Sequence, residues 1–94
     1  MSDKVRKEDL PRRMKRIPEW EIKKERLVRV FEFDEYMDAI DFINGVAEIA
    51  EDANHHPDII IRYTTVTLSL TSHDQAAITE RDFELASRLN TLID

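Results

Sequence analysis

The sequence predicts an α+β domain with helices packed on one face of a four-stranded antiparallel sheet. Three observations lead to this fold: a long amphipathic segment in mid-chain, a pair of strand-like segments on each side of it, and a helix-start signal before a C-terminal apolar stripe. The expected order is helix, two strands, helix, two strands, helix. With 94 residues, of which 41% are hydrophobic, the chain has room for one small domain with one core.

The N-terminal segment is rich in basic residues. We expect residues 1–7 to be a disordered basic lead-in and residues 8–94 to be the single domain. Residues 8–16 are compatible with a short helix, because Pro11 is tolerated in a first helical turn, and Pro18 would end it.

A β-hairpin is expected next. Residues 20–24 begin an alternating segment, and residues 27–33 consist largely of strand-forming types. The two segments are expected to pair through a turn at residues 24–26.

The middle of the chain has the clearest helical pattern. Asp34 is the expected N-cap, because its carboxylate can accept the free amide hydrogens of a first turn. Pro57 is expected to end the helix, because the residue before a proline disfavours the α conformation. Between them, apolar residues recur at helical spacing, as in a helix that lies across a sheet: Tyr36, Ala39, Ile40, Ile43, Val46, Ala47 and Ala50.

Two strands and a helix complete the domain. A third strand is expected at residues 59–61, and residues 65–71 alternate between apolar and hydroxyl side chains, as in a strand with one buried face. Thr79 and Asp82 have the spacing of a capping box, which predicts the start of the last helix. The apolar positions of that helix are Phe83, Leu85, Ala86, Leu89 and Leu92.

Composition excludes several classes of protein. The chain has no cysteine, which excludes disulfides and thiolate catalysis, and no apolar run reaches the 18 or so residues of a membrane span. No apolar stretch follows the basic N-terminus, so we expect no signal peptide and a cytoplasmic protein.

The net charge of −6 is unevenly distributed. Residues 1–16 carry a net charge of +4, and the remainder carries −10. A basic arm of this kind can hold anions or nucleic acid. We favour an arm that pairs with the acidic surface of its own domain, since that surface would repel a phosphate backbone.

All three histidines fall within one stretch, at His55, His56 and His73. Glu51 and His55 are four residues apart, so on a helix they would stack on the same face, where the carboxylate could fix the tautomer of the ring. A strand that returns beside the end of the helix could bring His73 close to the pair. Converging imidazoles supply both an acid and a base near neutral pH.

Seven residues in this region stand at fixed spacing: Glu51, His55, His56, Pro57, Tyr63, His73 and Asp82. The pattern resembles the signature of the pterin-4a-carbinolamine dehydratases, and the similarity covers about residues 8–92. The resemblance implies the four-stranded sheet with helices on one face. It also implies dehydration of a 4a-hydroxytetrahydropterin to the quinonoid dihydropterin, as part of tetrahydrobiopterin recycling, without a metal or an organic cofactor.

The same resemblance assigns roles to residues. It implies a pterin pocket with His55 and His73 as the acid/base pair and His56 as the residue that orients the ring, although His55 and His56 could exchange roles. Asp82 would give structural support, and Glu51 would support His55. The remaining implied substrate contacts are Asn54, Pro57, Thr71, Ser72 and Asp74, with Glu51 also at the site.

Two other functions compete with this one. Glu51, His55 and His73 could form a metal triad, but no compact metal-binding spacing is present. Animal members of the family also act as dimerisation cofactors that bind a partner through a helical surface, so a non-catalytic assembly role is the alternative. The family further implies a homodimer or homotetramer and a functional link to an aromatic amino-acid hydroxylase.

Overall fold

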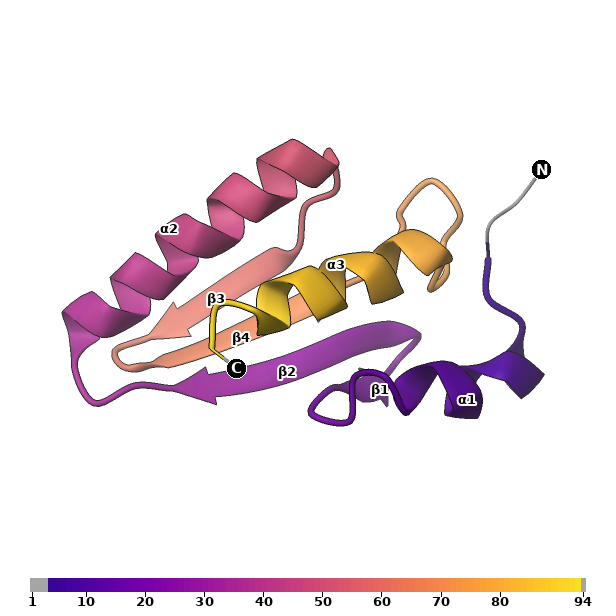
Figure 1. Cartoon of the computed structure of the whole chain (residues 1–94), viewed down its shortest axis with the longest axis horizontal. Helices are drawn as coiled ribbons and strands as arrows, with labels where there is room; N and C mark the ends of the chain where they lie inside the picture. Colours follow the sequence, from indigo (N-terminus) through magenta and orange to yellow (C-terminus); the bar gives the residue numbers. More distant parts are fainter. Residues whose placement is uncertain (1–3, 94) are drawn as a thin grey trace.

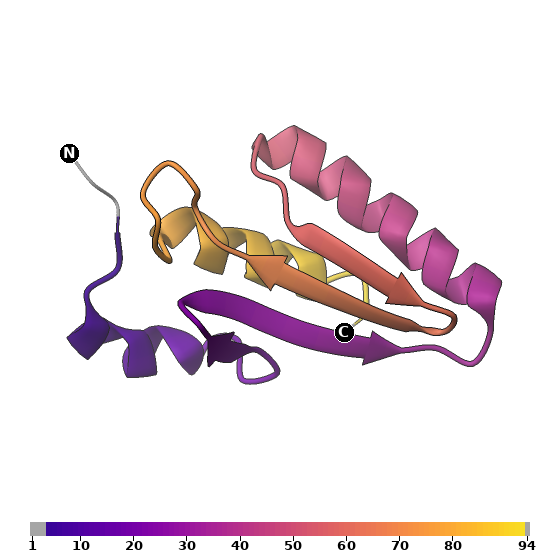
Figure 2. The ribbon, with the colours of Figure 1, turned by 180° about the vertical axis from the view of Figure 1, so that it is seen from behind.

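The computed structural model describes residues 4–93 and has the predicted α+β architecture (Figure 1). The antiparallel sheet has the strand order β1-β2-β4-β3. Its strands are β1 (Glu21–Lys23), β2 (Arg26–Glu32), β3 (Asp58–Arg62) and β4 (Thr65–Leu70). The helices are α1 (Leu10–Met14), which follows a short 3-10 turn (Lys7–Asp9), α2 (Tyr36–Ala53) and α3 (Glu80–Asn90). Both views show α2 and α3 on the same face of the sheet and α1 beside β1 (Figures 1 and 2).

The β1–β2 hairpin confirms the expected strand pairing. Lys24 and Glu25 form the turn between β1 and β2, and both have positive φ, 50° and 61°, as a two-residue hairpin turn requires. In β4, which pairs with both β2 and β3, the alternation buries Val66, Leu68 and Leu70 beneath the helices.

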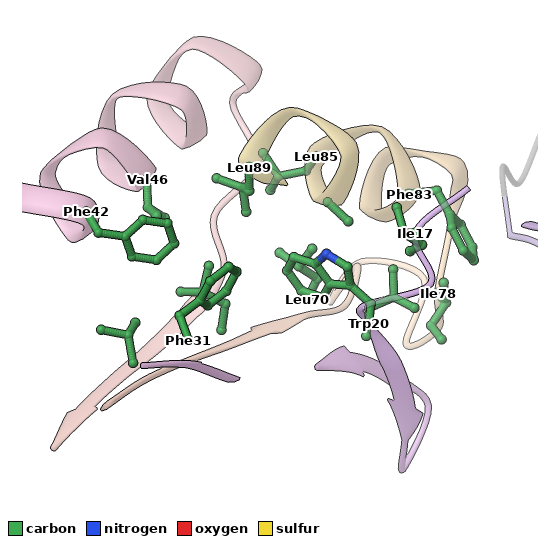
Figure 3. Close-up of a cluster of buried hydrophobic side chains, with 14 of the residues drawn as sticks. Ile17, Trp20, Phe31, Phe42, Val46, Leu70, Ile78, Phe83, Leu85 and Leu89 are labelled. Carbon is green, nitrogen blue, oxygen red and sulfur yellow. The ribbon is translucent and has the colours of Figure 1, made fainter. Parts of the chain in front are cut away.

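Aromatic rings pack among aliphatic side chains in the core between the sheet and the helices (Figure 3). Trp20 meets Phe31 edge-on, with ring centroids 6.3 Å apart, and Phe31 lies 4.6 Å from Phe42. The indole N–H of Trp20 donates to Oδ1 of Asn90 at 2.8 Å, which fixes the end of α3.

Several details of the helices differ from the prediction. The N-cap of α2 is Glu35, not Asp34, because Glu35 has extended backbone angles and its carbonyl accepts the amide hydrogen of Ala39. Tyr36 was expected in the core but is 46% exposed and stacks on Tyr63 of the β3–β4 turn. Phe42, which the predicted stripe omitted, is buried, whereas Ala47 is exposed.

The N-terminal arm packs on the domain earlier than expected. Residues 1–3 lie outside the described part of the chain, but residues 4–7 do not form a free lead-in. Val5 is buried, and its amide donates to the carbonyl of Ile78 at 3.1 Å. The arm packs on the domain because the apolar side chain of Val5, in an otherwise charged segment, is buried in the core. No helix among residues 4–93 is long and apolar enough to cross a membrane.

Candidate active site

The histidines gather at one end of the sheet because of strand register. Asp58 at the start of β3 pairs with Ser69 near the end of β4, so the residues just before β3 and just after β4 lie at the same edge. The end of α2 and the start of α3 also lie at this end of the molecule (Figures 1 and 2). Four segments far apart in the sequence therefore converge there.

A left-handed residue ends α2 and sets the direction of the histidine pair. Asn54 has φ 52° and ψ 40°, and the amide of His55 donates to the carbonyl of Ala50 at 3.1 Å. His55 and His56 thus follow the helix end, as predicted. Because the chain turns at Asn54, His55 does not occupy the next helical position above Glu51.

His55 binds a buried carboxylate from another helix. Its Nε2 lies 2.6 Å from Oδ1 of Asp82, and the two side chains are 12% and 0% exposed. The predicted pairing of His55 with Glu51 is therefore wrong, for the geometric reason given above. Asp82 takes the place of Glu51 as the support of this ring.

Asp82 is held on its second oxygen by the start of α3 and by the loop after β4. Its Oδ2 accepts hydrogen bonds from the Thr79 amide at 2.8 Å and the Ser72 hydroxyl at 3.0 Å. Thr79 and Asp82 form the predicted capping box, and the Ser72 and Thr79 hydroxyls are 2.7 Å apart. The carboxylate is thus fully partnered in a buried position, which keeps its orientation fixed.

This arrangement defines the tautomer of His55. An ionised carboxylate only accepts hydrogen bonds, so Nε2 of His55 carries the hydrogen that is shared with Asp82. In the neutral ring, Nδ1 then keeps a free lone pair. His55 and Asp82, which are 27 positions apart in the sequence, thus form an imidazole base with a fixed orientation.

His56 has a different environment from its neighbour. Its Nε2 contacts Oε2 of Glu51, and the two side chains are 55% and 77% exposed. Both groups are thus open to solvent at the end of α2. Glu51, which was predicted to pair with His55, contacts His56 instead.

His73 lies in the tight loop that follows β4. Residues 72–77 close on themselves, since the Ser72 amide donates to the Ala77 carbonyl at 3.0 Å and Ala76 takes a positive φ of 50°. The His73 side chain is exposed and forms no hydrogen bond or ion pair with the described residues. It shares the end of the sheet with His55 without touching it.

The other predicted contacts divide into exposed and internal groups. Asn54 is exposed and Pro57 is half-buried, both close to the histidine pair in the chain. Thr71 donates to the Ala77 carbonyl at 3.4 Å. The Ser72 hydroxyl is fully buried and bonded to Asp82, so its expected contact with a substrate is corrected to a supporting one.

Asp74 completes the loop on its outer side. Its Oδ1 accepts a hydrogen bond from Arg81 of α3 at 2.8 Å. This hydrogen bond, together with the positive charge of Arg81, lowers the pKa of Asp74 below its ordinary value of 3.8. The pair links the His73 loop to the first turn of α3.

The competing metal triad has no counterpart in the structure. Among residues 4–93, no group of three histidine, aspartate or glutamate side chains is arranged to hold a metal ion. Glu51 contacts His56, whereas His55 contacts Asp82, so the proposed ligands do not share one site.

Comparison with known proteins identifies the family of the chain. The family model described as pterin 4 alpha carbinolamine dehydratase matches residues 3–92. A protein of Haloarcula marismortui, provisionally named a pterin-4-alpha-carbinolamine dehydratase, is 50% identical over 80 residues, which cover 84% of this chain and 87% of that protein. A protein of Picosynechococcus with the same provisional name is 38% identical over 92 residues, covering 98% of this chain and all of the relative.

Solved structures show the same fold. A transcriptional coactivator/pterin dehydratase from Brucella melitensis superimposes with a TM-score of 0.91 at 24% identity, covering 97% of this chain and 99% of that one. A pterin dehydratase-like protein described as a RuBisCO assembly factor in the alpha-carboxysome gives a TM-score of 0.64 at 24% identity, covering 78% and 84% of the two chains. Taken with the family match and the sequence relatives, the chain belongs to the pterin-4-alpha-carbinolamine dehydratase family.

Proposed function

We propose that this protein dehydrates a 4a-hydroxytetrahydropterin to the quinonoid dihydropterin and water. The observation that carries the proposal is the His55–Asp82 pair, which supplies an oriented imidazole at the end of the sheet where His56 and His73 also lie. Family membership supports the substrate class. An assembly protein would not need a buried carboxylate that fixes one histidine tautomer.

The reaction consists of two proton transfers around one bond cleavage. The C4a–O bond breaks as the hydroxyl accepts a proton and leaves as water. The N5–H proton is removed, and its electron pair forms the N5–C4a double bond. An acid and a base that operate near neutral pH are sufficient, so the proposed mechanism uses no metal and no organic cofactor.

We assign His55 and His73 as the acid/base pair. Nδ1 of His55 suits the base, because its lone pair stays free while Asp82 holds Nε2–H. Asp82 also stabilises the imidazolium that forms when the ring takes up a proton. The side chain of His73 is exposed, and it suits the acid for the 4a-hydroxyl.

The remaining residues would bind and orient the pterin. His56, held by Glu51, would contact the ring from the end of α2. Asn54, Pro57, Thr71 and Asp74 border the same region and would line the pocket. Ser72 would act through Asp82, because its hydroxyl is buried.

A rate assay tests the proposal. A 4a-hydroxytetrahydropterin is generated in situ, and its loss is followed by ultraviolet absorbance with the wild type, His55→Ala and His73→Ala. We expect a wild-type rate well above spontaneous dehydration and a loss of at least about 100-fold in each variant, the scale of general acid–base catalysis. If a folded wild type gave no acceleration, the enzymatic function would be wrong.

The alternative is a non-catalytic dimerisation or assembly cofactor that binds a partner through a helical face. The outer face of α2 is exposed and acidic along its length, with Asp38, Asp41 and Glu48, so such a partner would need a basic surface. An assembly role would survive His55→Ala, whereas dehydration would not. The two functions are thus separated by one variant.

We further propose a homo-oligomer built through the edge of the sheet. β3 has a neighbour on one side only, and its central Ile60 is 53% exposed. Antiparallel pairing of two β3 strands about Ile60 would place Asp58 opposite Arg62 of the second copy. Light scattering should show a smaller particle for Ile60→Lys than for Val30→Lys, a matched change on the open sheet face, and equal masses would argue against this interface.

The location and the pathway of the protein are also part of the proposal. We propose a cytoplasmic protein that acts in tetrahydrobiopterin recycling beside an aromatic amino-acid hydroxylase, which would form the carbinolamine substrate. A hydroxylase gene next to the gene for this chain would support the link. Loss of hydroxylase-dependent growth on deletion of this gene would test it.

A further inference from the structure

A hollow lies away from the histidines, beneath the N-terminal arm. It has a volume of about 460 Å³ and is bordered by the arm, α1, the β1–β2 hairpin and the end of the loop after β4. Its floor is apolar, with Leu10, Met14, Ile22 and Ile78 among the lining side chains. No histidine lines it, so its use is independent of the proposed dehydratase.

Part of the apolar floor is exposed because the two long helices do not reach this part of the sheet. α2 and α3 cover β2, β3 and β4, whereas β1 has only α1 and the arm beside it (Figures 1 and 2). Ile22 therefore remains 39% exposed, although it pairs with the fully buried Leu27. A concave apolar surface of this size is typical of a site for a small ligand.

The rim of the groove is positive in an acidic protein. Lys4 and Lys7 line it from the arm, and Glu25 lines it from the hairpin turn. The ammonium group of Lys7 forms no ion pair with any described residue. Two other basic groups of the arm are paired, Arg6 with Glu8 at 2.7 Å and Arg12 with Asp9 at 3.2 Å.

We propose that this groove binds a small amphipathic anion, a free monocarboxylate with an aliphatic chain. The chain would lie on Leu10, Met14 and Ile22, and the carboxylate would lie at the lysine rim. A concave floor with cations at its border fits such a molecule, because both parts of the ligand find a complementary surface. Outside residues 1–16 the chain carries a net charge of −10, so the lysine rim is the favoured place for an anion.

The groove also borders the end of the loop that carries His73. Ala77 and Ile78 form one of its walls, and Ala77 is the residue that closes the loop onto Ser72. A ligand in the groove would thus contact the segment that holds this loop. Amides of the loop serve as reporters of binding.

Binding is tested by titrating the full chain with sodium decanoate below its micelle concentration and following amide NMR shifts. We expect saturable shifts confined to residues 4–14, 22–25 and 77–78. Decyltrimethylammonium, which has the same chain length and the opposite charge, should bind at least about fivefold more weakly, since the rim would repel it.

Two matched pairs of variants locate the site. Ile22→Glu should weaken decanoate binding by about tenfold, whereas Val30→Glu on the open sheet face should change it by less than about twofold. Lys7→Glu should weaken it by about fivefold, whereas Lys15→Glu, an equal charge change outside the groove, should have little effect. If Ile22→Glu fails to fold by circular dichroism, Ile22→Thr replaces it, with the same direction expected.

Three results would overturn the proposal. Equal binding of the cationic probe, or shifts spread over the whole surface, would show that no anion site exists. An oligomer that Ile22→Glu converts to monomers would show that a second copy covers the groove. Sedimentation of the wild type, but not Ile22→Glu, with phosphatidylcholine vesicles would assign the face to a membrane instead.

Discussion

Two histidine–carboxylate pairs involve consecutive histidines of this molecule. They contain the same functional groups but differ in burial and in hydrogen-bond support. His55 and Asp82 are 12% and 0% exposed, and Asp82 has two further hydrogen bonds. His56 and Glu51 are 55% and 77% exposed and have no such support among the described residues. The same two functional groups are thus found once in a fixed, buried network and once at the surface.

The difference explains why we assign the chemistry to His55. A buried pair is weakly screened, and its geometry is held by the surrounding hydrogen bonds. An exposed pair contributes little free energy and keeps its side-chain freedom. Orientation of a base needs the first kind of environment, whereas contact with an incoming substrate suits the second.

Of the substitutions at the two pairs, Asp82→Asn should have the largest effect. The amide would donate to His55 and reverse its tautomer, so that Nδ1 carries the hydrogen and its lone pair is lost. Long-range proton–nitrogen NMR spectra should show this exchange of the protonated ring nitrogen. The free energy of unfolding, measured by urea denaturation, should also fall by about 1–3 kcal/mol, because Asp82 caps α3. An unchanged tautomer would contradict the assigned role of Asp82.

The two histidines should differ in their effect on stability. His55→Ala leaves a buried oxygen of Asp82 without its partner, which should lower the free energy of unfolding by about 1–3 kcal/mol. His56→Ala removes an exposed contact and should cost less than about 0.5 kcal/mol. Urea denaturation of the two variants checks the difference, and equal losses would argue against it.

Much of this fold follows from local patterns in the sequence. The 3.6-residue period of α2, the alternation in β4 and the capping box at Thr79 each predict an element from residues that are close in the chain. The sequence also predicts at which end of the sheet the candidate site lies. Hairpin turns and strand register are sufficient to bring the segment before β3 next to the segment after β4.

The partners of the histidines were not predictable in the same way. The helical spacing of Glu51 and His55 predicts a pair, but the left-handed Asn54 turns the chain before His55. An asparagine just before the His-His-Pro run is a signal for such a helix end. The burial of Ser72 and Asp82 depends on how α3 packs on the loop after β4, which is a long-range contact that no local pattern encodes.

Salt should sharpen the contrast between the pairs. Glu51→Gln should change the free energy of unfolding by less than about 0.5 kcal/mol at low ionic strength, and the change should vanish at about 1 M salt, where exposed charges are screened. Urea denaturation at both salt concentrations measures this. A salt-independent loss would indicate that the Glu51–His56 contact is more than a surface pair.

Asp74 provides a third, smaller comparison. Because its pKa is lowered from 3.8, its contribution to stability is present above that value and is lost as the pH falls through the lower folded-state pKa. Arg81→Gln should return the pKa of Asp74 towards 3.8, as measured by carboxyl carbon NMR. If the pKa did not rise in the variant, Arg81 would not be its cause.

The most direct test replaces each carboxylate by its amide and compares dehydration rates. Asp82→Asn removes the fixed support of His55, and Glu51→Gln is the matched change at the exposed pair. If the buried pair orients the catalytic base, Asp82→Asn should slow dehydration of 4a-hydroxytetrahydropterin by at least about 50-fold, and Glu51→Gln by less than about threefold. Equal rates in two folded variants, or a larger loss in Glu51→Gln, would contradict this account.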